Sequence, residues 1–358
     1  MKNKLKSILF LFILFIIFSF FFRNHIFGNS FIPFDSKDQV YPFVVFVSQS
    51  YRSGAIPLWN PFLYSGTPSY ADPLYMTFYP GTLLFLIPKI LSQNFFDIVE
   101  LLHIFVGGVS LFIFLRHYVA SKWIALSASI LFLLGGTLIG RIQHYTQICA
   151  VSLFPVILLS IKFGLLKQKL IYFGLSGFIL GSILMIGYQP ALLFCLVITA
   201  FTYIEFNSLE YPKQKRVKKF LIFFGFLSLI TFGTSLIQLL PTYEFSQLSS
   251  RPSFDISGAI SGAIKPVSLF TILFSNIFGL ISRDTISDSY FYIGAAPIFF
   301  ALYSLFNWKK LSNIHRYFLI VTLISFFYAL GKDSPIFPIL YKLFPPIRLF
   351  RRPSDSFF

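Results

Sequence analysis

Apolar stretches of nearly bilayer-spanning length recur along almost the whole chain. They lie near 5–22, 97–115, 123–140, 147–165, 171–188, 191–207, 220–240, 290–307 and 317–331. A helix needs roughly 20 apolar residues to cross the hydrocarbon core of a membrane. The chain is 56% hydrophobic and 12% charged, whereas a soluble domain is typically about 25% charged. The sequence therefore predicts an all-α polytopic membrane protein, a single transmembrane domain over 1–358 with about nine transmembrane helices.

The charged residues divide between the two ends of these stretches. The basic ones gather in short connecting segments that hold few acids: Lys2, Lys4, Lys6, Arg116, Lys122, Lys162, Lys167, Lys169, Lys213, Lys215, Arg216, Lys218, Lys219, Lys309, Lys310 and Arg316. Most acids fall in the other connections: Asp35, Asp38, Asp72, Glu244, Asp255, Asp284, Asp288, Asp333 and Asp355. Because Lys and Arg are enriched in cytoplasmic loops, we expect a cytoplasmic N-terminus. The long loops 23–96 and 241–289 then share the extracytoplasmic face, and the net charge of +16 reflects membrane orientation more than nucleic-acid binding.

The first stretch and the two cysteines narrow this class further. The stretch follows a lysine-rich start, but no small-residue cleavage site comes after it, which favours an uncleaved signal anchor. Cys149 and Cys195 both lie in apolar stretches and lack the spacing of a metal site. We expect both to be reduced thiols.

The first long loop has features of a folded cap. Prolines that fix backbone turns punctuate it, at Pro33, Pro42, Pro57, Pro61, Pro68, Pro73 and Pro80. Apolar residues at helical spacing predict an amphipathic interfacial helix over 40–51. Segments 79–91 and 267–281 are too short to span a membrane and favour interfacial or re-entrant helices.

Short motifs occur in or beside the connecting segments, from near the start of the chain to its end. The first loop contains Asp35-Ser36-Lys37-Asp38-Gln39-Val40-Tyr41-Pro42, Pro57-Leu58-Trp59-Asn60-Pro61 and Tyr79-Pro80. Later come Arg141 with His144, Gly187-Tyr188-Gln189-Pro190-Ala191, Pro241 with Glu244, Ser250-Arg251, Tyr292-Ile293-Gly294 and Phe350-Arg351-Arg352-Pro353. In kind and order these motifs resemble the YfhO-like family of bacterial membrane proteins. The Pro-Leu-Trp-Asn-Pro block carries most of the specificity.

The resemblance implies a GT-C-type glycosyltransferase of the bacterial cytoplasmic (inner) membrane. Such an enzyme moves a sugar from a polyprenyl-phosphate carrier to an extracytoplasmic acceptor, here a teichoic-acid-like polymer or another envelope glycan. Its partners would be the lipid-linked donor, membrane lipid and the acceptor, with no nucleic acid. Family members are usually longer, so the resemblance also implies that this chain is the N-terminal portion of a larger protein.

Two carboxylates at the start of the first loop are candidates for the catalytic base. Glycosyl transfer with inversion needs a group that takes the proton of the attacking hydroxyl. Asp35 holds the position of the acid that opens the family's loop motif, and Asp38 is its rival. The structural alternative is that both are solvated loop acids or residues that start a helix.

A second set of residues could bind the donor and its leaving phosphate. Cationic and polar side chains suit this task, and Arg offers paired donors. The candidates are Arg141, His144, Gln189, Glu244, Arg251 and Arg351. Arg141 is equally compatible with a helix-end anchor that reaches water, and Glu244 with a solvated acid.

Asp97, Glu100 and His103 lie on neighbouring turns at the outer start of the second stretch. Because ionisable groups inside a bilayer usually face a cavity or a partner, the trio could complete the site or hold a divalent cation. The favoured alternative is an acid pair at the positive helix N-terminus with a hydrogen-bonded interior histidine. Metal dependence and cofactors stay undetermined.

Two other classes of function remain open. A transporter would also have many spans, but we find no related halves with paired broken helices. A non-catalytic membrane protein of envelope assembly fits the same topology. Phosphate-binding loops, dinucleotide-binding glycine turns and the zinc-protease and serine-hydrolase motifs are absent from the sequence, which agrees with a lipid-linked donor.

Overall fold

The computed structural model describes residues 2–187, 191–209, 213–249, 256–260, 262–264, 266–274, 292–343, 347 and 353. Over these ranges the chain is helical, and the one β contact is an isolated bridge between Asn60 and Thr67. The chain divides into two compact units. The first comprises Met1–Leu133, Ile142–Ala191 and Pro212–Phe245, and the second comprises Leu134–Arg141, Leu192–Tyr211 and Ser246–Phe358.

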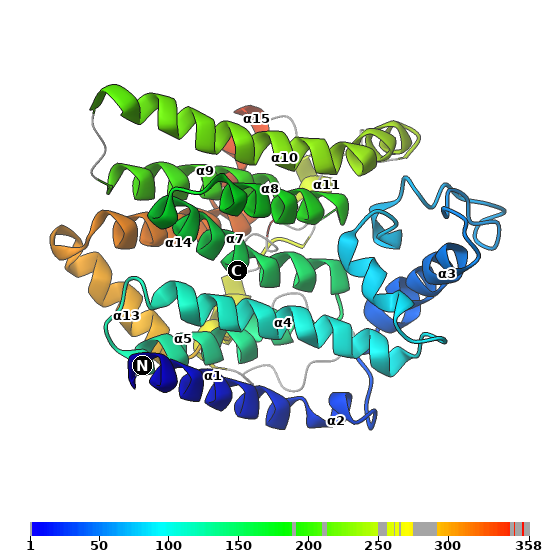
Figure 1. Cartoon of the computed structure of the whole chain (residues 1–358), viewed down its shortest axis with the longest axis horizontal. Coiled ribbons are helices and arrows are strands. Elements are labelled where there is room, and N and C mark those ends of the chain that lie inside the picture. The colour runs from blue at the N-terminus through cyan, green and yellow to red at the C-terminus, as the bar shows by residue number, and fades with distance from the viewer. Residues whose placement is uncertain are drawn as a thin grey trace. The chain divides into compact units, whose positions relative to one another are not determined.

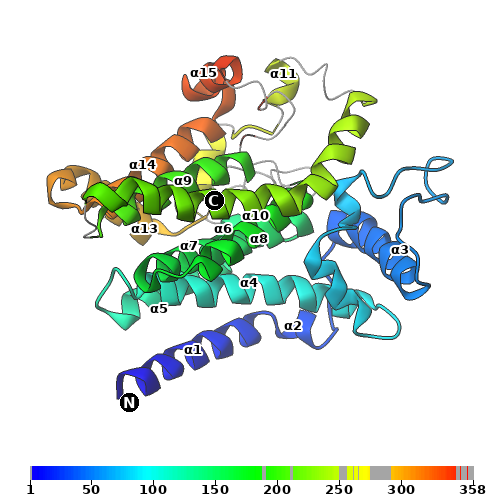
Figure 2. The same ribbon diagram turned by 45° about the horizontal axis from the view of Figure 1, so that its top comes forward.

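The first unit contains the first loop and the long helices that meet it at one end (Figure 1). They are α1 (Lys2–Phe21), α2 (Arg23–Ile26), α3 (Tyr41–Arg52), α4 (Gln93–Leu115), α5 (Lys122–Leu134), α7 (Tyr145–Lys167), α8 (Leu170–Met185) and α10 (Lys213–Gln247). Three shorter helical turns belong to the loop itself: η1 (Ser36–Val40), η2 (Pro73–Tyr75) and η3 (Pro80–Leu86). Figure 2 shows α10 bending toward its C-terminal end, where the helix contains Pro241.

The second unit has its own small core. Its elements are α6 (Gly136–Ile139), α9 (Ala191–Asn207), α11 (Ile256–Ala259), η5 (Pro266–Leu269), α12 (Phe270–Leu273), α13 (Ala295–Phe306), η7 (Trp308–Lys310), α14 (Asn313–Ala329), η8 (Gly331–Asp333) and α15 (Ile336–Leu343). Ala259, Tyr328, Phe337 and Ile347 form a buried cluster, and the Tyr317 hydroxyl donates to the Val197 carbonyl. These contacts join α9, α11, α14 and α15.

A helix occurs at every apolar stretch named above, although the third stretch is divided by Gly135 into α5 and α6. Among the described helices, three are long and apolar enough to cross a membrane: Gln93–Leu115, Tyr145–Lys167 and Arg216–Gln247. The remaining apolar helices of 10–17 residues are shorter than that length. Both cysteines, Cys149 and Cys195, are free thiols.

Helices α4 and α7 run in the same direction and pack along most of their length. Near their first turns the rings of Phe96 and Tyr145 stack with centroids 4.6 Å apart. Further along, Gly107 lies against the Ser152 backbone so closely that no side chain would fit. Helix α1 lies antiparallel beside α4. This direction is seen from Phe10, in the first half of α1, which stacks on Phe112 near the C-terminal end of α4.

Small residues let α8 approach α10. A Cβ atom at Gly177 would overlap the Leu227 carbonyl oxygen, and one at Gly181 would overlap Thr234. In lipid the hydrophobic effect does not drive helices together, so such close packing between small residues is a main source of association. The two glycines therefore fix how α8 and α10 meet.

The first loop and a lysine-rich segment contact opposite ends of α10. Lys219 at the start of α10 donates to Gln168, just beyond α7, over 2.9 Å. The first loop lies at the opposite end, where the Gln238 amide of α10 donates to the Tyr70 carbonyl over 3.0 Å. Lys219 and the loop thus lie at opposite ends of α10.

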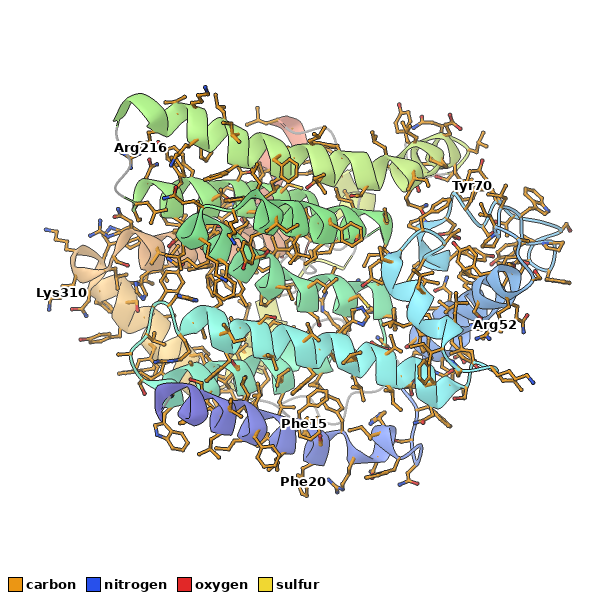
Figure 3. The ribbon with its side chains drawn as sticks, viewed as in Figure 1. Phe15, Phe20, Arg52, Tyr70, Arg216 and Lys310 are labelled. Carbon is orange, nitrogen blue, oxygen red and sulfur yellow. The ribbon has the colours of Figure 1, made fainter. Side chains whose placement is uncertain are left out.

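The first loop is folded, as its prolines predict; we call residues 27–92 the cap. The predicted helix over 40–51 is present as α3, and Phe43 on it stacks on Tyr75 at 4.1 Å between centroids. Arg52, labelled in Figure 3 with Tyr70, ends α3 and donates to the Phe85 carbonyl over 3.0 Å. The segment 79–91 holds the short 3-10 helix η3 in place of an interfacial α-helix. Of the segment 267–281, η5 and α12 cover the first part, and residues 275–281 lie outside the described ranges.

A labelling experiment tests the expected orientation of the first unit. In a variant without native cysteines, a cysteine at Ser53 in the cap should react in intact cells with a maleimide that does not cross membranes. A cysteine at Lys169, between α7 and α8, should react only after the membrane is opened. Labelling of both positions in intact cells would contradict a cap and a basic end on opposite faces.

A glycine substitution tests the α8–α10 contact. Gly177→Ala should lower the free energy of unfolding in detergent by about 1–3 kcal/mol, because the added methyl group overpacks the contact. Gly233→Ala on α10 is the matched control, since no described atom lies within 4 Å of its Cβ position. The control should be neutral or slightly stabilising. Equal thermal unfolding midpoints for the two variants would show that this contact is not close packed.

Candidate functional site

The chain enters the cap through an irregular segment that carries Asp35. Phe34 has a φ of 58°, in the left-handed region that bulky residues rarely adopt. The next residues, Ser36–Val40, form a π-helical turn, a feature that is rare and often found at functional sites. This backbone needs support from elsewhere in the protein.

Two acidic residues of α4 supply that support by accepting hydrogen bonds from the segment. The Ile32 amide donates to Asp97 Oδ2 over 2.9 Å, and the Ser36 hydroxyl donates to Glu100 Oε2 over 3.1 Å. The Gln93 side chain donates to the other oxygen of Asp97 over 2.8 Å. All these contacts are within the first unit, and both carboxyl groups are fully buried. The acids therefore bind the cap's entry segment.

The expectation that this acid pair caps α4 is wrong. Ser92 occupies the N-cap position, and its hydroxyl accepts a hydrogen bond from the Phe95 amide over 3.2 Å. Asp97 and Glu100 lie beyond the first turn, and their hydrogen-bond donors are Ile32 and Ser36 of the cap and the Gln93 side chain. Their oxygens are used for tertiary contacts.

Asp35 projects from this supported segment toward α7. Its Oδ2 atom lies 3.3 Å from His144 Nδ1, while 55% of the Asp35 side chain stays exposed. Although Asp35 directly precedes η1, its side chain makes no capping hydrogen bond there. Its carboxylate is thus paired with an imidazole at an accessible position.

His144 is held by the start of α7. It is the N-cap residue of that helix, and its carbonyl accepts the Gln147 and Ile148 amides. Only 10% of its side chain is exposed. Because α7 packs against α4, the imidazole and the segment carrying Asp35 are fixed to the same pair of helices.

Asp38 lies in a different environment. It is exposed on η1, and its side chain has no hydrogen bond or ion pair with another described residue. From the sequence, both Asp35 and Asp38 were candidates for the catalytic base. The structure places Asp35, and not Asp38, beside His144.

His103 belongs to a buried network on the same face of α4. Its Nδ1 lies 2.7 Å from the Val99 carbonyl, which can only accept, so Nδ1 carries the proton. Its Nε2 then accepts from the Tyr79 hydroxyl over 2.8 Å. Burial raises the pKa of Tyr79 well above its usual range, so this hydroxyl remains a donor. The expected hydrogen-bonded interior histidine is therefore present.

The trio of Asp97, Glu100 and His103 does not have the arrangement of a metal site. Each residue has a hydrogen-bond partner of its own, as described above. Among the residues that the structure describes, no group of three or more His, Cys, Asp or Glu side chains could hold a metal ion.

The other predicted binding residues fall in different places. Arg141 belongs to the second unit and is 1% exposed, which does not fit an anchor that reaches water. Glu244 is exposed in the last turns of α10. Gln189, Arg251 and Arg351 lie outside the described residues.

Sequence reasoning missed the cap residues that meet these α4 side chains. Ser36 and Tyr79 were available as polar residues of the cap, but no spacing rule links them to positions 64 and 24 residues away. One usable signal was the three-residue separation of Asp97 and Glu100. Residues so spaced share one helix face, and a buried acid on that face requires a donor.

The chain was compared with models of protein families, with curated proteins and with solved structures, and none of the three comparisons finds a match.

A conservative substitution tests the buried tyrosine–histidine contact. Tyr79→Phe should lower the free energy of unfolding by about 1–3 kcal/mol, because the buried Nε2 of His103 loses its donor. Tyr64→Phe is the matched control, since that ring is 89% exposed. Thermal unfolding in detergent should separate the two variants. Equal midpoints would mean that the hydroxyl of Tyr79 contributes nothing to stability.

Proposed function

We propose that the protein is a GT-C-type membrane glycosyltransferase of the YfhO-like family, with Asp35 as its catalytic base. The enzyme would move a sugar from a polyprenyl-phosphate carrier to a hydroxyl of an extracytoplasmic envelope glycan or teichoic-acid-like polymer. The observation that carries the proposal is the accessible Asp35 carboxylate, paired with His144 at the cap end of long apolar helices. The motifs of the first loop supply the link to the family.

The proposed chemistry follows from the placement of this carboxylate. The acceptor oxygen attacks the anomeric carbon of the donor sugar, and the bond from that carbon to the phosphate oxygen breaks. Asp35 takes the proton of the attacking hydroxyl, and the carrier leaves as polyprenyl phosphate. A correctly placed base contributes roughly 10²- to 10⁴-fold in rate. The proton on Asp35 is afterwards lost to water.

His144 has a supporting role in this scheme. A neutral imidazole that donates from Nδ1 to Asp35 Oδ2 fixes the direction of the carboxylate. The helix that positions His144 is also the helix that packs on α4, so the base and its partner cannot move independently. The leaving phosphate needs cations, and Arg141, Arg251 and Arg351 remain the candidates from the sequence.

The membrane topology belongs to the same proposal. About nine spans in the bacterial cytoplasmic membrane, with the N-terminus in the cytoplasm, would place the cap outside. The opposite positions of the cap and of Lys219 with Gln168 within the first unit support this orientation. A lipid-linked donor would then approach from the bilayer and a polymeric acceptor from the outer solution.

Substitution of the two cap carboxylates tests the function. Asp35→Asn keeps the shape and removes the base, so transfer should fall roughly 10²- to 10⁴-fold. Asp38→Asn is the matched control and should stay near wild type. The measurement is incorporation of labelled sugar from a panel of polyprenyl-phosphate sugars into envelope polymer, in membranes with equal amounts of each full-length protein.

The outcomes separate the alternatives. Loss of transfer in Asp38→Asn but not in Asp35→Asn would make Asp38 the base. Full transfer in both variants would remove the catalytic role of the cap. An active envelope pathway in cells, without sugar transfer by the protein itself, would favour a non-catalytic assembly role.

A further inference from the structure

We infer that Glu100 is a positioning residue that, together with Asp97, holds Asp35 in its reactive place. The inference rests on the proposed function and names two residues through which the base is oriented. Neither acid contacts Asp35 directly. They bind the residues on either side of it, Ile32 before and Ser36 after.

The residue spacing on α4 and on the cap's entry segment allows the two hydrogen bonds to form together. Asp97 and Glu100 are three residues apart on α4 and therefore share one helix face. Ile32 and Ser36 are four residues apart on the cap's entry segment. Two hydrogen bonds from one rigid helix thus bracket Phe34 and Asp35, and both bonds are buried.

The backbone conformation of Phe34, between the two hydrogen bonds, requires such support. Phe34 is held at a φ of 58°, which a bulky side chain disfavours. Such a conformation persists only where the surrounding structure determines it. If either bond were lost, Phe34 could relax to an extended or right-handed conformation, and the direction of Asp35 toward His144 would change.

Glu100 and Asp97 differ in how their oxygens are used. Asp97 accepts from Ile32 and from Gln93, so both of its oxygens have donors. Glu100 accepts from Ser36 through Oε2, and among the described residues no donor reaches Oε1. The Ser36 contact requires only an acceptor oxygen, and the side-chain amide of glutamine also supplies one.

Two substitutions at Glu100 separate positioning from chemistry. Glu100→Gln preserves the acceptor and should keep transfer within a few-fold of wild type. Glu100→Ala removes the acceptor and should lower transfer by about 100-fold, the effect expected when a reactive group is displaced by about 1 Å. Ser36→Ala removes the donor of the same bond, so it should reproduce the alanine variant, and the double variant should add little.

A second measurement reports the cap independently of activity. A spin label on a cysteine introduced at the exposed Lys37 should be immobile in the wild-type background and in Glu100→Gln. It should become mobile in Glu100→Ala and in Ser36→Ala. Detergent-solubilised protein that elutes as a single species and unfolds cooperatively serves as the check that each variant is folded.

The results that overturn the inference are distinct from failure of the proposed function. Loss of transfer in Glu100→Gln with an immobile label would make the carboxylate itself a participant in the chemistry. An immobile label in Glu100→Ala would show that Glu100 does not hold the segment. If the wild-type protein transfers no sugar, the proposed function fails, while the label still decides whether Glu100 orders the segment around Asp35.

Discussion

Burial of two carboxyl groups just beyond the first turn of α4 is the constraint on which the candidate site depends. A buried acid must find donors or destabilise the fold. Asp97 and Glu100 find theirs in the cap and in Gln93, so the requirement to satisfy them also fixes the entry segment of the cap. Two acids that are costly in an apolar helix thereby hold the part of the loop that carries Asp35. The position of Asp35 follows from that organisation.

The fold of the individual helices was predictable because apolar length and periodicity are local properties. The nine stretches and the helix over 40–51 each correspond to a helix. The break at Gly135 and the 3-10 geometry of η3 were not predictable, since both depend on the packing of neighbouring segments. Spanning a membrane requires both length and apolar composition, and three of the described helices meet both requirements.

The candidate site was predictable in part. Asp35 was singled out by its position in the loop motif of the family it resembles, and residue type and position near helix ends singled out His144, Asp97, Glu100 and His103. Their partners were not, because pairs such as Ser36 with Glu100 join positions that are far apart in the sequence. The aromatic residues of the cap show the same limit. Tyr64 is 89% exposed, whereas Tyr79 of the same cap is 4% exposed.

The parallel direction of α4 and α7 has an electrostatic consequence for the end that carries Asp35. A helix N-terminus carries roughly half a positive charge, and the effect is confined to its first turn. Parallel neighbours bring two such ends to one side of the unit, and the first turn of α7 begins immediately after His144. The partial positive charge of that turn therefore favours negative charge close to the imidazole. An antiparallel pair would have placed one carbonyl-rich end beside one amide end, and their opposite partial charges would largely cancel.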